Sequence, residues 1–242
     1  MNNPKNNIIY GRNPVKEALK ANRVLMVYLA NGFSNPEILS SVSENNAKVS
    51  YLSSHDLDNL CQGGVHQGIA AKVKDYEYWS LESLLAKAKK EGKPLIVILD
   101  GIEDPHNLGA ILRCADVFKV TGVIIPRHNQ VALNATVAKT SAGAINYVPV
   151  CLVTNLNQAI SALKKAGFWV VSSDGSAQME YQNLEYDFNV ALVIGSEGQG
   201  VSRLVLNNSD YIVKIPQYGH VNSLNASVAT GILLAKIREK LI

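Results

Sequence analysis

Residues 99–126 read LDGIEDPHNLGAILRCADVFKVTGVIIP, and this stretch predicts a strand–helix–strand unit of a parallel sheet. The apolar run Leu95–Leu99 predicts the first strand, and Val123–Ile125 predicts the second. The polar loop between them carries Asn107, and the helix after the loop carries Arg113. Ligands of open α/β sheets bind at loops that leave the carboxyl ends of strands, so this loop is a candidate site.

Two interpretations of this pair of residues stay open. Asn107 and Arg113 are six positions apart, about 1.7 helical turns, which would let both face one crevice if the helix begins near His106. Alternatively, Asn107 caps the helix and Arg113 lies on its solvated face.

A glycine-containing loop follows the predicted strand 189–194 and reads GSEGQG over 195–200. Its glycines, together with Glu197, would expose backbone groups to a ligand. The G-x-x-G-x-G spacing is not a P-loop, a dinucleotide fingerprint or a hydrolase nucleophile elbow. The alternative is a tight turn before a helix over 201–207.

A third polar segment, IPQYGHVNSLNAS over 215–227, follows the predicted strand 211–215. Asn222 or Ser223 would cap the final helix, predicted over 224–241. Capping needs one residue, so several small polar side chains at one helix start also indicate a ligand site. Loops after parallel strands meet at one sheet edge, which predicts that these three segments converge.

The first part of the chain predicts a separate small α/β layer. Residues 1–74 hold eight lysines and arginines against five acidic residues, whereas the remaining residues are balanced. A basic module beside a neutral one fits a nucleic-acid-binding domain, although ordinary surface variation also explains +3. The predicted strands are 8–10, 24–30, 49–52 and 69–73. The predicted helices are 15–21, capped by Asn13 with Pro14 at the first helical position, a helix that starts at Asn35-Pro36, and 54–61.

Length and composition allow one large or two modest domains, because the chain has 242 residues and is 47% apolar. We predict domains at 1–74 and 95–242, joined by a linker over 75–94 that holds a helix near 79–91. A further strand is predicted at 168–173. The alternation of strands and helices predicts an α/β fold with a mostly parallel sheet.

The sequence also limits the cellular location and the metal content that we expect. It has no apolar run of membrane-spanning length and no signal-peptide pattern at the N-terminus. Three scattered cysteines fit a reducing cytoplasm, and no metal-ligand spacing occurs, so no metal is expected.

The three segments together resemble the catalytic domain of the SpoU/TrmH family in the SPOUT superfamily. Asn107 and Arg113 match its first motif, Gly195–Gly200 its second, and Ile215–Ser227 its third. YGRNPVKEAL over 10–19 and VHQGI over 65–69 resemble the family's L30e-like substrate-binding domain. The resemblance implies an α/β fold with a C-terminal trefoil knot, preceded by the L30e-like domain.

The resemblance further implies S-adenosylmethionine-dependent 2′-O-methylation of a ribose in structured RNA by a homodimer, with a guanosine of 23S rRNA as the expected target. Arg113 would activate the 2′-hydroxyl or anchor a phosphate. The other implied residues are Asn107, Glu197, Ser223 and Asn225 for catalysis, Gly195, Gly198, Ile215 and Leu224 for the cofactor, and Arg12 and Gln67 for RNA.

Lys119, Asn146 and Gln217 depart from the family's usual residues, which leaves the RNA target open. The alternatives are tRNA, another rRNA nucleoside, or a non-catalytic rRNA-binding module. A nucleotide-dependent oxidoreductase lacks its fingerprint.

Overall fold

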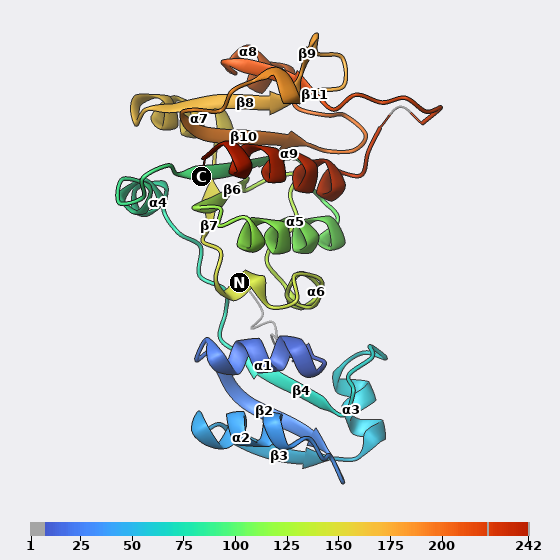
Figure 1. Cartoon of the computed structure of the whole chain (residues 1–242). Helices are drawn as coiled ribbons and strands as arrows, with labels where there is room; N and C mark the ends of the chain where they lie inside the picture. The colour runs from blue at the N-terminus through green and yellow to red at the C-terminus, as the bar shows by residue number, and fades with distance from the viewer. Residues whose placement is uncertain (1–7, 222, 242) are drawn as a thin grey trace. The chain divides into compact units, whose positions relative to one another are not determined.

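The computed structural model describes residues 8–221 and 223–241. Its contacts divide the chain into two units (Figure 1). Unit 1 contains the residues up to Glu77 together with Leu133–Tyr147. Unit 2 contains Tyr78–Ala132 and the chain from Val148 onward.

Unit 1 is built on a four-stranded sheet in the order β1-β4-β2-β3. Strand β4 runs antiparallel to both of its neighbours, and β2 is parallel to β3. Helix α1 contacts β2 and β4 and packs beside α2, while α3 contacts β2 and β3. Leu57, Cys61 and Ala70 form the core under α3. The bounds are β1 Ile8–Tyr10, α1 Arg12–Lys20, β2 Val24–Ala30, α2 Pro36–Glu44, β3 Lys48–Leu52, α3 Ser54–Leu60 and β4 Ile69–Val73.

A later segment of the chain completes unit 1. It contains α6 (Ala135–Thr140) and the short helix η1 (Ala144–Asn146), and α6 contacts β1 and α1. The Tyr147 hydroxyl donates to Glu17 Oε2 at 2.7 Å. Arg23 donates to the Asn146 side chain at 3.2 Å. The predicted boundaries at 74 and 95 stay predictions, and they did not include this segment in the first domain.

Unit 2 contains a seven-stranded sheet in which all neighbouring strands are parallel, in the order β7-β6-β5-β10-β8-β11-β9. This confirms the predicted α/β class with a parallel sheet. The strands are β5 Leu95–Asp100, β6 Gly122–Pro126, β7 Val150–Val153, β8 Phe168–Ser173, β9 Met179–Glu180, β10 Asn189–Gly195 and β11 Tyr211–Lys214, with the short helix η2 at Tyr181–Asn183.

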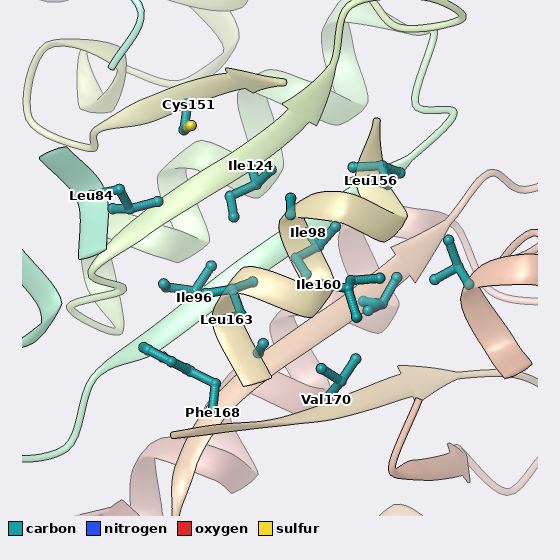
Figure 2. Packing of buried hydrophobic residues seen from close by; sticks show 14 of the residues in the cluster. Leu84, Ile96, Ile98, Ile124, Cys151, Leu156, Ile160, Leu163, Phe168 and Val170 are labelled. Atoms are coloured by element: carbon teal, nitrogen blue, oxygen red, sulfur yellow. The ribbon is translucent and has the colours of Figure 1, made fainter. Parts of the chain in front are cut away.

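Helices cover both faces of this sheet. Figure 2 shows Ile160 and Leu163 of α7 packed over Ile96 and Ile98 of β5, in a cluster that also takes in residues of α4 and α8. On the other side α5 and α9 pack against each other and contact β6 and β10 (Figure 1). The bounds are α4 Leu81–Ala88, α5 Pro105–Val117, α7 Leu156–Lys165, α8 Arg203–Asn207 and α9 Ala226–Leu241.

Several local predictions need correction. The N-cap of helix α1 is Gly11, not Asn13, and the helix begins at Arg12, because Gly11 takes a positive φ of 94° that turns the chain two residues earlier. The cap at Asn35 is confirmed, since its side chain accepts from the Ile38 amide at 3.0 Å. Strand β7 and helices α6 and α7 were not predicted.

Among the described residues, no helix is long and apolar enough to cross a membrane.

Candidate active site

The three polar segments meet at one edge of the unit 2 sheet, as predicted. Strand β5 pairs with β10, β10 with β8, and β8 with β11, all in parallel. The loops that leave their carboxyl ends therefore lie at the same edge.

One side chain from each polar segment joins a closed hydrogen-bond network. Asn107 lies in the first turn of α5 and not, as predicted, in the loop before it, because Asp104 caps the helix. Asn107 Nδ2 donates to Glu197 Oε1 at 3.1 Å, and Asn225 Nδ2 donates to the same oxygen at 2.5 Å. Asn225 Nδ2 also donates to Asn107 Oδ1 at 2.8 Å. The Ala226 amide is a further donor to Glu197 Oε1. Asn107 is 7% exposed, so its amide depends on these partners.

Two helices begin beside the network. Asp104 caps α5 by accepting from the His106 amide at 2.8 Å, so the interpretation of Asn107 as the cap is wrong. Asn225 accepts from the amides of Ser227 and Val228 and holds the start of α9. The predicted caps at Ser223 and Asn222 are not the described ones, and Asn222 lies outside the described residues. Because Asp104 caps α5, the Asn107 side chain is available to the network, whereas Asn225 both caps α9 and joins the network.

Arg113 does not join this network within the chain. Six helical positions separate it from Asn107 by about 240° around the axis, so the two side chains leave α5 on different faces. Arg113 is exposed and lines neither of the two cavities described below. Arg113 therefore does not share either of these cavities with Asn107. Its predicted role in catalysis stays a prediction.

The glycine loop forms a tight turn and also borders a cavity. The Gly200 amide donates to the Ser196 carbonyl at 2.8 Å, which closes the turn. A Cβ atom on Gly195 would lie 2.0 Å from the carbonyl carbon of Gly200. Only glycine permits this approach of two backbone segments, so the tight turn is confirmed, while ligand binding by the loop stays a prediction.

Two cavities open beside the network. The larger is a cleft of about 1250 Å³ bordered by Asn107, Glu197 and Gly198. The smaller, of about 150 Å³, is bordered by four other predicted residues: Gly195, Ile215, Ser223 and Leu224. Glu197 lies on both.

The loop after β8 also belongs to the site, although the sequence did not predict it. Ser173, Asp174 and Gly175 line the smaller cavity, together with Gln217. Asp174 also lines the larger cleft. A polar residue directly after the predicted strand 168–173 was the available signal. Its position between the other loops depends on the strand order β10-β8-β11, which the sequence does not reveal.

The two residues predicted to bind RNA are neighbours in unit 1. Gln67 Oε1 accepts from the Arg12 amide at 2.9 Å, and both side chains are exposed.

The cysteines do not offer an alternative nucleophile. Burial raises the pKa of Cys61, with a smaller contribution from Asp58, and burial alone raises that of Cys151, each to about 11. Burial also raises the pKa of Cys114. The thiols therefore stay protonated near neutral pH. The described residues contain no group of three or more His, Cys, Asp or Glu side chains that could hold a metal ion.

Comparisons with known proteins agree with this arrangement. Residues 94–235 match the SpoU rRNA Methylase family, and residues 8–79 match the RNA 2′-O ribose methyltransferase substrate-binding domain. A protein of Staphylococcus haemolyticus assigned to the TrmH family of tRNA/rRNA methyltransferases is 44% identical over 238 residues, covering 96% of this chain and 95% of that protein.

Solved structures share the fold. The AdoMet-bound rRNA methyltransferase of Sinorhizobium meliloti has a TM-score of 0.81 at 22% identity and covers 97% of this chain and 87% of its own. The TrmH/SpoU tRNA-modifying enzyme of A. aeolicus has a TM-score of 0.57 at 31% identity over 66% of this chain and 81% of its own.

The fold and the site define a parallel α/β enzyme unit with a ligand cavity at the carboxyl edge of its sheet, preceded by a small substrate-binding module. Within that class, the chain belongs to the SpoU/TrmH family and is an RNA 2′-O-ribose methyltransferase.

Proposed function

We propose that this protein transfers a methyl group from S-adenosylmethionine to the 2′-hydroxyl of a guanosine in 23S rRNA, in the cytoplasm. The target is that of the bacterial 23S rRNA guanosine-2251 2′-O-methyltransferase, which the motifs resemble. The observation that carries the proposal is the Asn107–Glu197–Asn225 network beside the smaller cavity. A binding module without catalysis would not need this network.

The residues of the smaller cavity fit the proposed cofactor. Ile215 and Leu224, with the alanines at the start of α9, provide an apolar wall that suits an adenine ring. Asp174 and Glu197 border both cavities and favour a positively charged sulfonium. Gly195 brings backbone close to the cavity without a side chain in the way. The AdoMet-bound structure of the S. meliloti rRNA methyltransferase, which has the same fold, supports this assignment.

The cofactor supplies a methyl carbon that is already activated by its positive sulfur. The protein's own residues must then orient the ribose hydroxyl, take up its proton and exclude water. Glu197 fixes the amides of Asn107 and Asn225, so these groups stay oriented without reorganisation during the reaction. Arg113 is assigned to the 2′-hydroxyl or to the adjacent phosphate, as a planar donor of several hydrogen bonds.

The exposed position of Arg113 supports a homodimer in which each arginine serves the partner's site. Val117 on α5 is 67% exposed and Val228 on α9 is 50% exposed. Because α5 and α9 pack together, these side chains offer apolar surface for a two-fold contact.

Mixing two inactive variants tests the shared site. Arg113→Ala and Glu197→Ala should each be inactive alone, and mixed subunits should recover up to about a quarter of wild-type turnover, because half of the dimers are mixed and each holds one intact site. No recovery, despite demonstrated subunit exchange, would place Arg113 in its own chain's site.

Mapping 2′-O-methyl groups in rRNA and tRNA of a deletion strain tests the target. We expect one 23S rRNA guanosine to lose its methyl group, with recovery when the gene is restored. The A. aeolicus tRNA enzyme favours tRNA as a second candidate, although it matches 66% of this chain against 97% for the S. meliloti rRNA enzyme. Loss confined to tRNA would overturn the 23S assignment and keep the chemistry.

A further inference from the structure

Two aromatic rings of unit 1 rest on the glycines of the loop 62–68. A Cβ atom on Gly64 would lie 2.4 Å from the ring of Tyr10. A Cβ atom on Gly68 would lie 2.9 Å from the ring of Phe33. Each ring therefore lies directly against loop backbone, and any larger residue at these two positions would displace it.

Each of these rings also carries a cation. Lys139 Nζ lies 4.8 Å from the centroid of the Tyr10 ring, and the Arg12 guanidinium carbon lies 5.9 Å from that of Phe33. Both cations are exposed. Within residues 8–221 and 223–241 neither forms a salt bridge, whereas nearby Lys16 is paired with Glu37. Their charges are thus not neutralised by protein carboxylates there.

The loop between the rings is held by its own hydrogen bonds. His66 Nδ1 accepts from the Gly68 amide at 3.0 Å, and its Nε2 lies 3.0 Å from Asp58. Gln67 holds the Arg12 amide. Val65 projects from this loop and is 71% exposed. These hydrogen bonds fix the loop against the two rings.

We infer that Tyr10, Arg12, Phe33, Val65 and Lys139, here called the ring–cation surface, bind an unpaired segment of the RNA substrate. The inference rests on the proposed function and deepens it. Lys139 is the new element, because it lies in the segment 133–147, outside the substrate-binding domain matched at residues 8–79.

The chemistry of the surface favours unpaired RNA. A guanidinium that lies on one aromatic ring presents its second face to a base, and splayed bases of loops and bulges stack on such planes. The ammonium of Lys139 is suited to a backbone phosphate. A duplex keeps its bases stacked and would use the phosphate contact alone.

Salt-dependent binding by the 242-residue chain tests the surface. The probes are unmodified 23S rRNA transcript, a short oligouridylate and a matching duplex. The variants are Lys139→Ala, Lys139→Arg, Arg12→Ala and Arg12→Lys. Lys48→Ala is the matched control, because Lys48 is an exposed lysine on β3, at the opposite edge of the same sheet from β1.

Lys139→Ala should raise Kd about three- to tenfold and lower the slope of log K against log salt by about one, while Lys139→Arg and Lys48→Ala leave the slope unchanged. Arg12→Lys should keep the slope but lose affinity for oligouridylate, because an ammonium stacks poorly. The duplex should lose affinity with Lys139→Ala only.

Equal slopes for Lys139→Ala and Lys48→Ala, with normal folding, would overturn the inference. So would failure of the wild type to bind any of the RNAs. The proposed function can fail independently of this inference. If the salt slopes change as stated but no rRNA guanosine is methylated, the proposed function is wrong and the ring–cation surface is still supported as an RNA-binding surface.

Discussion

Unit 1 and unit 2 use polar side chains in different ways. In unit 2, Asn107, Glu197 and Asn225 bond to one another, and each comes from a different polar segment at the sheet edge. In unit 1, Arg12 and Lys139 lie over aromatic rings with their charges exposed. A mutually bonded network is preorganised for one geometry, whereas exposed cations adapt to a flexible polyanion. Changes in unit 2 should therefore act on turnover, and changes in the ring–cation surface on affinity.

Replacement of Arg113 should give the largest effect and would sharpen this division. Arg113→Ala should lower methyl transfer by about a thousandfold or more, because the lost donor acts on the acceptor group. Cofactor affinity, measured by calorimetry, should change little. The melting temperature should stay constant, since the side chain is exposed.

Lys165→Ala, an exposed charge on α7, is the control for this variant. Near-wild-type turnover of Arg113→Ala would remove the residue from the mechanism.

Glu197→Ala should give the next largest effect, because three donors lose their shared acceptor. We expect turnover to fall by about 10²- to 10³-fold and stability by about 1 kcal/mol, since Glu197 and Asn225 are solvent-accessible and water can replace part of the loss. Single-turnover assays and urea unfolding measure the two quantities.

Glu197→Gln keeps one acceptor oxygen and should retain more turnover than Glu197→Ala. If both variants raised only the KM for RNA, the network would act in binding, and the contrast between the units would disappear.

Lowering the pH should give the smallest of these effects. This effect depends on how the segment 133–147 is held in unit 1. Burial by itself would raise the pKa of Glu17, but hydrogen bonds from Tyr147 and Lys20 outweigh it and hold that pKa below the usual 4.5. A carboxyl with a lower pKa in the folded state contributes stability above its unfolded pKa and loses it as the pH falls through the folded value.

Tyr147→Phe should therefore lower the urea midpoint near neutral pH and make its decline below about pH 4.5 shallower. Tyr51→Phe, on an exposed tyrosine of β3, should leave the profile unchanged. Parallel profiles for Tyr147→Phe and the wild type would show that this contact does not stabilise unit 1.

The sequence was sufficient for the parts of the fold that depend on local pattern. The apolar run Leu95–Leu99 and the cap at Asn35 were predictable because burial of a strand and capping of a helix involve neighbours in sequence. The three polar loops were predictable as one site because parallel strands place their carboxyl ends together. The family motifs added the chemistry.

Only the tertiary structure decided which side chains meet. The strand order put Asp174 between the other loops. The tertiary structure also assigned Leu133–Tyr147, and with it Lys139, to unit 1. The physical reason is shared: local sequence fixes backbone conformation within a few residues, whereas strand order, helix rotation and docking depend on the packing of surfaces contributed by distant parts of the chain.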